Sequence, residues 1–206
     1  SVSTFAGNPY FIDLEELIKK ELLTKEECEA CDWGGSESYV DYEKMYLSRY
    51  KLLRKAYEKA DLKTNPDYAE FLKEEKDWLQ DYCLFMAIKN DQKGICWIDW
   101  PEELKDRHSK AVKEAEKELA EEIEFYRFQQ YCFTTQWRKL KAYANKKGIS
   151  IIGDVPIYVA LDSSDAWANP EMLQFDEDYD PKAVAGCPPD AFSATGQLWG
   201  NPLYRW

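Results

Sequence analysis

The chain has 206 residues, with 39 acidic and 27 basic side chains that give a formal net charge of −12. This acid excess argues against nucleic acid or an anionic membrane as the main partner, because both attract positive surfaces. No apolar run approaches the roughly 20 residues that span a bilayer, and SVSTFAGNPY at the start does not resemble a signal peptide. We therefore expect a folded cytoplasmic protein that is part of a longer polypeptide.

Local signals predict a series of helices in the first part of the chain. Asp13 is placed to cap one helix, and Thr24 and Glu27 form a capping-box pattern before the next. An apolar stripe predicts a helix over 41–60. Asn65-Pro66 then opens a further long helix, because proline in the first turn needs no amide hydrogen.

The region 101–147 predicts one long helix that adjusts near Phe125 and stops at Gly148. Its first half, 110–124, is charged, whereas its second half, 125–143, is rich in aromatic residues. We expect the charged half to lie on a surface and the aromatic half to be buried.

The composition changes near Gly148, since residues 148–206 contain nine acidic and only two basic side chains. The apolar run at 149–155 is typical of a strand buried on both faces of a parallel sheet. A long helix followed by such a strand forms half of a βαβ unit. The remaining turn-rich stretch predicts ordered loops at the carboxyl end of that strand, where α/β enzymes keep their sites.

The six cysteines are spread thinly, which favours reduced thiols over a disulfide framework. Cys28 and Cys31 form a lone C-x-x-C motif, for which two small side chains on one face of a short helix is a better interpretation than a zinc site. The single histidine, His108, is expected to be a solvated helix residue. No metal is therefore predicted.

Several side chains suited to sugar binding follow the predicted strand. Asp154 comes directly after it, where a carboxylate points into the mouth of a barrel, although the same residue could simply lock the next turn. Sugars need carboxylates and amides for their hydroxyl groups and flat rings for their C–H faces. Within twelve positions the chain offers Asp190, Phe192, Gln197, Trp199 and Asn201. The alternative is that the two aromatic residues anchor a loop on the core.

The stretch GISIIGDVPIYVALDSSDAWANPEMLQFDED, followed by VAGCPPDAFSATGQLWGNPLYRW, resembles the 4-α-glucanotransferase family, also called amylomaltase or disproportionating enzyme. STFAGNPYFIDLEEL, VDYEKMY and EKDWLQDYCLFMAIK extend the resemblance over the whole chain. It implies an α/β fold: a fragment of a (β/α)8 TIM barrel, predominantly helical because it carries a large helical insertion. The implied segments are barrel strand and loop at 1–12, helical insertion at 13–124, and barrel helix, strand and active-site loops at 125–206.

The resemblance also implies an enzyme of carbohydrate metabolism that transfers α-1,4-glucan chains between maltooligosaccharides, with retention of configuration and without a cofactor. The reacting aspartate and glutamate are expected after Trp206, so no catalytic residue is assigned. The substrate-binding residues that it implies are Asp154, Asp190, Phe192, Gln197, Trp199 and Asn201, with Tyr46 at a second glucan-binding groove.

Two alternatives to a transferase segment are considered: a non-catalytic α-glucan-binding module and a purely helical interaction domain. The loop motifs disfavour the helical domain. Since strand 149–155 lacks neighbours to close a barrel, we also expect self-association through its exposed edges.

Overall fold

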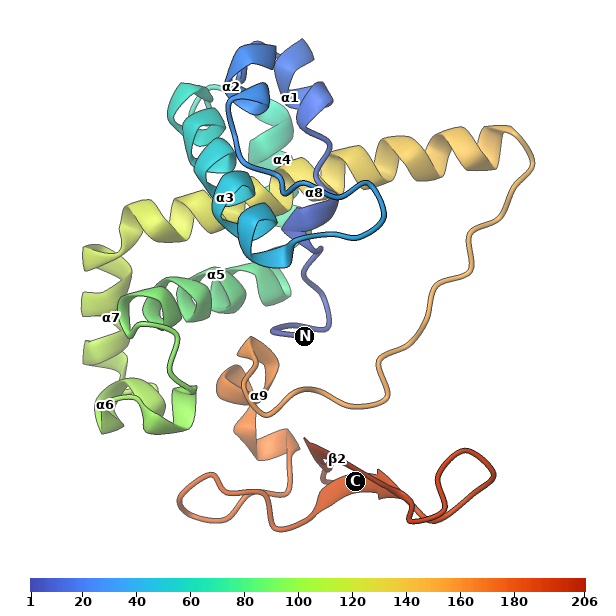
Figure 1. Ribbon diagram of the computed structural model, residues 1–206. Coiled ribbons are helices and arrows are strands. Elements are labelled where there is room, and N and C mark those ends of the chain that lie inside the picture. Colours follow the sequence, from blue (N-terminus) through green and yellow to red (C-terminus); the bar gives the residue numbers. More distant parts are fainter. The chain divides into compact units, whose positions relative to one another are not determined.

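The computed structural model describes residues 1–206, most of which lie in helices and turns (Figure 1). In chain order the elements are a 3-10 turn at Pro9–Phe11, α1 (Leu14–Lys19), α2 (Lys25–Glu29), α3 (Tyr42–Lys59), α4 (Pro66–Glu74), α5 (Lys76–Asp91), a 3-10 turn at Trp97–Asp99, α6 (Glu102–Lys105), α7 (Ser109–Glu118), α8 (Ala120–Lys146), α9 (Ser164–Ala168), a 3-10 turn at Pro170–Met172, β1 (Val184–Cys187) and β2 (Gln197–Pro202).

The chain divides into two compact units, each built from separate stretches of sequence. The first unit contains 1–6, 77–123 and 152–206, and the second contains 7–76 and 124–151. Each unit therefore combines parts of the segments expected at 1–12, 13–124 and 125–206. The assignment of those three segments to a barrel and its insertion stays a prediction. No helix is both long and apolar enough to cross a membrane.

The helix starts of the second unit follow the local signals. The Asp13 carboxylate accepts a hydrogen bond from the Glu15 amide at 2.9 Å and caps α1. Thr24 and Glu27 form the reciprocal capping box of α2, with bonds of 3.1 and 3.0 Å. The Asn65 carboxamide caps α4, where Pro66 occupies the first turn as predicted. Each such cap contributes about 1 kcal/mol to stability.

The core of the second unit forms between α3 and α8. Leu52, Leu53 and Ala56 of α3 are fully buried in the same cluster as Phe125 and Phe128 of α8. Burying one leucine or phenylalanine side chain contributes roughly 1.5–3 kcal/mol, so this helix pair supplies much of the unit's stability.

Tryptophans dominate the core of the first unit. Phe85 of α5 lies against Trp100 and Trp167, with ring centroids 5.4 and 5.9 Å apart. Buried indole groups need acceptors, and here backbone carbonyls provide them. Trp97 donates to Leu161 O at 2.8 Å, and Trp167 donates to Leu104 O at 3.0 Å. These bonds fix the segment that leads into α9 against the 3-10 turn at Trp97–Asp99, and α9 against α6.

The helix predicted over 41–60 forms without interruption as α3, but the other two long helices predicted from the sequence are interrupted. The helix opened by Asn65-Pro66 breaks at Glu75 between α4 and α5, and the region 101–147 forms α6, α7 and α8 with a bend at Leu119 rather than near Phe125. No glycine or proline stands at either break. Tertiary packing therefore bends the chain where local propensity would continue a helix.

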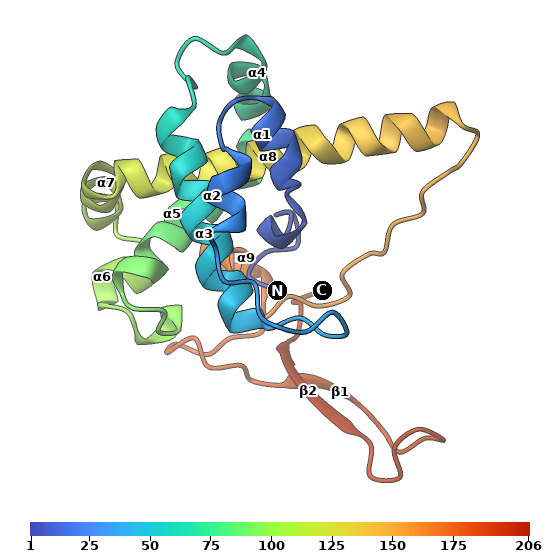
Figure 2. The same cartoon turned by 45° about the horizontal axis from the view of Figure 1, so that its top comes forward.

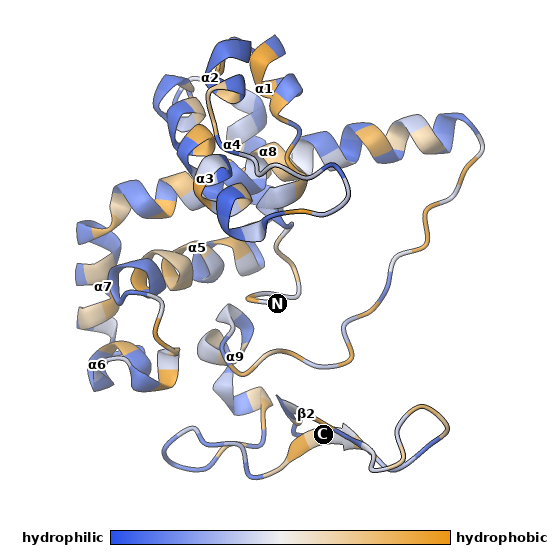
Figure 3. Ribbon diagram, in the orientation of Figure 1, coloured by the Kyte–Doolittle hydropathy of each residue, from blue (hydrophilic) through white to orange (hydrophobic).

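The second half of α8 is buried over only part of the predicted length. Side chains from Phe125 to Cys132 are mostly buried, but Trp137, Leu140 and Tyr143 are 40, 56 and 62% exposed. Figure 3 shows hydrophobic residues along this half of the helix. Burial stops where no other part of these 206 residues covers the helix.

The segment 149–155 is extended but forms no strand, which differs from the predicted buried parallel strand. Ile152 and Val155 are 93 and 77% exposed. Gly148 ends α8 with a φ of +77° as expected, and the apolar segment follows it (Figure 3). A parallel strand is stable only between neighbouring strands, and the one sheet of the chain is β1 with β2. Self-association through this segment stays a prediction.

The turn-rich end of the chain contains an antiparallel hairpin that the sequence did not predict. β1 pairs with β2, with Gly186 opposite Leu198 and Cys187 opposite Gln197 (Figures 1 and 2). A Cβ on Gly186 would lie 2.5 Å from Gln197 O, and Gly196 has a φ of +74°. Only glycine tolerates these two positions, which lets the strands approach closely and turn into the loop 188–196.

Candidate functional site

The loop 188–196 is fixed by an aspartate and a serine. The Asp190 carboxylate accepts hydrogen bonds from the amides of Phe192 and Ser193 at 2.9 and 2.8 Å. The Ser193 hydroxyl donates to Gly196 O at 2.7 Å. These bonds hold the Phe192 ring out of the loop, where it is 94% exposed. The Phe192 ring is therefore open to solvent and does not anchor the loop on the core.

Trp199 lies in β2, and two contacts orient its indole ring. Its Nε1 donates to the Gln197 carboxamide at 3.1 Å, and its ring centroid lies 6.1 Å from that of Tyr158. Trp199 is nevertheless 48% exposed. The arrangement orients a flat aromatic surface and leaves part of it open to solvent.

Asn201 connects the base of the hairpin to the segment after the predicted strand. Its side-chain amide donates to Val159 O at 2.9 Å. This contact, together with the Tyr158–Trp199 ring pair, places 158–159 beside β2. Tyr158 was not singled out from the sequence, although it stands four residues after Asp154 in an aromatic and apolar stretch. Asn201 positions the hairpin in this structure.

Asp154 is exposed, and one of its carboxylate oxygens accepts a hydrogen bond from the Val155 amide at 2.9 Å. This bond matches the turn-locking alternative raised from the sequence. The second oxygen remains available for a hydroxyl group. No hydrogen bond links Asp154 to the hairpin, so its place beside the hairpin loop is a prediction.

Tyr46 belongs to the second unit, on α3. It is 50% exposed, and its ring centroid lies 4.7 Å from that of Tyr50. Burial, together with the nearby Tyr46 and Tyr10, raises the pKa of Tyr50 to about 12. Tyr50 therefore stays neutral and supports Tyr46 as a fixed ring on the helix surface.

Neither cysteines nor the histidine build a metal centre. Cys28 and Cys31 pack against the core of the second unit, and Cys31 Sγ donates to Glu27 O at 3.5 Å. Burial raises the pKa of the Cys28 thiol, which disfavours the thiolate that binds zinc. No group of three or more histidine, cysteine, aspartate or glutamate side chains is arranged to hold a metal ion.

The hairpin therefore combines exposed flat rings with carboxylate and amide groups on one short stretch. Phe192 and Trp199 can face the C–H surfaces of a sugar, while Gln197 and Asp190 lie next to them on the same strand and loop. No histidine lies nearby in sequence, and Asp190 is the single carboxylate of the hairpin and its loop. The geometry suits binding of a polyhydroxylated ligand more than bond cleavage.

Comparison with known proteins decides the family. The sequence model of the family described as 4-alpha-glucanotransferase matches residues 1–206, the entire chain. The chain belongs to the 4-α-glucanotransferase family. This finding confirms the resemblance that the loop and helix motifs indicated.

Curated relatives agree with this assignment. The chain is 47% identical over 207 residues to a 4-alpha-glucanotransferase of Clostridium butyricum and 47% identical over 210 residues to one of Thermus thermophilus. Both alignments cover 100% of the chain but only 42 and 41% of the relatives. The chain thus spans about two fifths of the length of the 4-α-glucanotransferases it matches.

A solved structure shows the same fold. The structure of amylomaltase from Streptococcus agalactiae in complex with acarbose has a TM-score of 0.93 to this chain at 39% identity. The match covers 100% of the chain and 42% of the amylomaltase chain. The fold of this chain is therefore similar to that of part of an amylomaltase.

Proposed function

We propose that residues 1–206 are part of a cytoplasmic 4-α-glucanotransferase that moves α-1,4-glucan segments between maltooligosaccharides. The observation that carries this proposal is the family match over the entire chain. The acarbose complex of the similar amylomaltase supports α-glucan oligosaccharides as ligands. The mechanism requires no cofactor, because carboxylates alone perform it.

The proposed reaction is a retaining double displacement. An aspartate attacks the anomeric carbon and forms a glycosyl–enzyme bond, while a glutamic acid protonates the oxygen of the departing chain. A hydroxyl group of an acceptor sugar then attacks the same carbon, breaks the carbon's bond to the aspartate and gives the hydroxyl proton to the glutamate. We assign both reacting carboxylates to polypeptide after Trp206, so the 206 residues contribute binding rather than bond cleavage.

The binding contribution comes mainly from the hairpin and its loop. Trp199 and Phe192 would stack on glucose rings, and Asp190 and Gln197 would meet hydroxyl groups beside them. Asp154 would contribute at the reaction centre. Positioning of the acceptor by such contacts is what favours a sugar hydroxyl over water in the second displacement.

Two further assignments concern the rest of the chain. Tyr46, on a separate helix surface, would contact a second part of a long glucan. The barrel helix and strand at 125–155 would belong to a (β/α)8 barrel, and the helices at 13–124 would form an insertion in it. The 0.93 TM-score to an amylomaltase supports this placement.

Isothermal titration with maltoheptaose tests the binding role. The chain presents only part of a sugar site, so we expect a Kd of about 1 mM, equivalent to about −4 kcal/mol. Trp199→Ala should weaken binding about tenfold, because stacking contributes about 1–1.5 kcal/mol. The matched control is Trp137→Ala, which removes another partly exposed indole outside the hairpin. Equal binding by the wild type and Trp199→Ala would refute the stacking role.

Glucose release from maltotriose tests the activity. The 206-residue chain should release none, whereas a chimera in which it replaces the matching 207 residues of the Clostridium butyricum relative should disproportionate maltotriose. Turnover by the chain alone would contradict the location of the reacting carboxylates. A folded but inactive chimera would favour the non-catalytic glucan-binding module.

A further inference from the structure

The ammonium group of Lys89 links the end of α5 to the segment that precedes α9. The Lys89 side chain is only 15% exposed, and its Nζ donates to Asp162 Oδ2 at 2.5 Å. Nζ also donates to Gly94 O and Ile95 O, each at 3.1 Å. A lysine ammonium has three donors, and here all three have acceptors within the chain. Lys89 therefore holds other parts of the chain and does not itself bind a ligand.

Asp162 depends on Lys89 for its one ion pair. The other carboxylate oxygen, Asp162 Oδ1, is buried and has no hydrogen-bond partner. A carboxylate that loses its cation in such a place still carries the cost of its desolvation. Without Lys89, we therefore expect Asp162 to turn towards water and to move the backbone on both sides of it.

The backbone next to Asp162 is attached to the core of the first unit. We call residues 158–162 the strap. Near its end, the strap accepts a second bond at Leu161 O, to which Trp97 Nε1 donates at 2.8 Å. Trp97 is fully buried. The end of the strap is thus fixed by two side chains, of which Lys89 supplies the charged contact.

The start of the strap contacts the hairpin. The ring centroid of Tyr158 lies 6.1 Å from that of Trp199, and the Asn201 side chain donates to Val159 O at 2.9 Å. The strap therefore connects the Lys89–Asp162 pair to β2 within five residues. A displacement at Asp162 would reach the Trp199 ring through this short segment, all of which belongs to the first unit.

We propose that Lys89 is a positioning residue for the glucan site, because its ion pair with Asp162 sets the position of the strap and thereby the orientation of the Trp199 ring. The proposal rests on the proposed function, in which Trp199 stacks on glucose. The bonds of Lys89 to Gly94 O and Ile95 O are a separate, structural role, since they only close the turn after α5.

Fluorine NMR of the chain labelled with fluorotryptophan tests the link without any sugar. The signals of Trp199 and Trp137 are assigned by their loss in Trp199→Ala and Trp137→Ala. Lys89→Met should shift the Trp199 signal and leave that of Trp137, which belongs to the other unit. Asp162→Leu should do the same, although it keeps the bonds of Lys89 to the backbone. The matched control is Lys113→Met, which removes an exposed lysine of α7 and should shift neither signal.

Kinetics of the chimera with the Clostridium butyricum relative test the consequence for the reaction. Lys89→Met and Asp162→Leu should each raise KM for maltotriose between about threefold and thirtyfold. The value of kcat should change by less than about twofold, because the stacking ring is distant from the reacting carboxylates. Since both substitutions break one link, the double variant should raise KM no further than either substitution alone.

Several results would overturn the proposal. They are an unshifted Trp199 signal in Lys89→Met, an active chimera whose KM is unchanged, and effects on KM that multiply in the double variant. If Lys89→Met does not fold, Asp162→Leu decides, because it leaves the turn after α5 intact. A chimera that is inactive before any substitution would contradict the transferase activity and, with it, the role of Lys89 in the reaction.

Discussion

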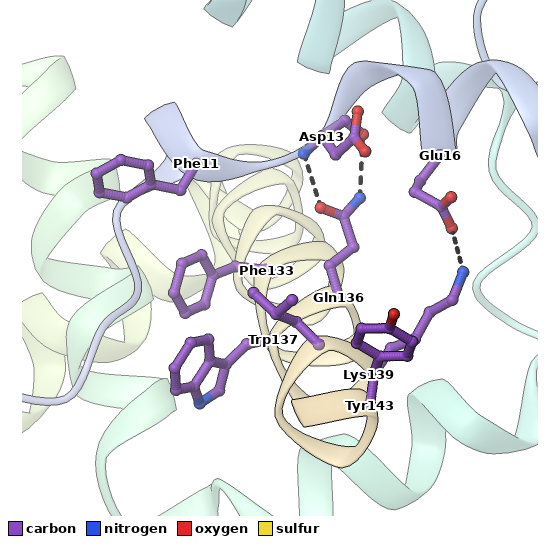
Figure 4. Close-up of a pocket in the computed structure, with 9 residues that line it drawn as sticks. Phe11, Asp13, Glu16, Phe133, Gln136, Trp137, Lys139 and Tyr143 are labelled. Carbon is purple, nitrogen blue, oxygen red and sulfur yellow. Dashed lines mark hydrogen bonds and ion pairs between the residues drawn. The ribbon is translucent and has the colours of Figure 1, made fainter. Parts of the chain in front are cut away.

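Two glutamines of α8 hold the backbone before α1 in the same way but differ in burial. Gln130 accepts from Gly7 N at 2.8 Å and donates to Gly7 O at 3.0 Å. Gln136 forms the equivalent pair with Asp13, at 2.7 and 3.1 Å (Figure 4). Gln130 is 1% exposed, whereas Gln136 is partly exposed and Asp13 is exposed. Comparison of these two glutamines therefore isolates the effect of burial on the stability that such a pair of side-chain hydrogen bonds contributes.

The substitution Gln130→Leu keeps the side-chain size and removes both bonds. It leaves the amide and carbonyl of Gly7 without partners beside a buried position, and each unsatisfied buried group costs about 1–3 kcal/mol. Since Gly7 itself is partly exposed, we expect a loss of about 2–4 kcal/mol in the free energy of unfolding. At Gln136, water can replace the lost partner, so Gln136→Leu should cost about 1 kcal/mol or less.

Urea unfolding followed by far-UV circular dichroism measures the two losses. The difference of about 2 kcal/mol corresponds to about a thirtyfold difference in the ratio of folded to unfolded protein. The midpoint for Gln130→Leu should be the lower one, with the slope of the transition unchanged. Equal midpoints for the two variants would refute the argument that burial sets the cost.

Three other predictions concern an ion pair, a thiol and a glycine. Hydrogen bonds from Lys139 and Lys19 lower the pKa of Glu16 to about 2; their stabilising effect is therefore present at neutral pH and lost as the pH falls from about 4.5 to 2, and Lys139→Met should raise the midpoint in an NMR titration. Burial raises the pKa of Cys132 to about 12, so iodoacetamide should modify it only after urea unfolding. Gly196→Ala, which forces a side chain into a φ of +74° and against the facing strand, should weaken maltoheptaose binding in calorimetry by distorting the loop, as long as the variant remains folded.

Local signals predicted the helix starts, because their causes are local. The caps at Asp13, Thr24 and Asn65 each satisfy amide groups within three residues, so the sequence contains the whole interaction. The bends at Glu75 and Leu119 have no such local cause. They depend on how distant side chains pack, which a single sequence does not state.

The candidate site was likewise predictable only in part, because some of its features depend on contacts between distant residues. Residue types suited to sugar binding were recognisable in the sequence, and Phe192 and Trp199 are exposed, while their contact with a sugar stays a prediction. The hairpin that presents them was missed, because its register depends on the close approach at Gly186 rather than on alternating apolar residues. Tyr158 was missed because its contact with Trp199 joins residues 41 positions apart.

The exposed sugar-binding candidates and the exposed Trp137 and Leu140 of α8 have one explanation. The pattern at 149–155 and along α8 states which side chains favour burial, but burial also needs a partner, and this chain has none for them. Phe192 is likewise open to solvent on a hairpin that offers one side of a sugar site. A sugar held on one side only loses its contacts quickly, whereas a pocket normally encloses most of its ligand. Tight glucan binding should therefore require further polypeptide of the family around the hairpin, and the chimera should bind maltoheptaose more tightly than the isolated chain.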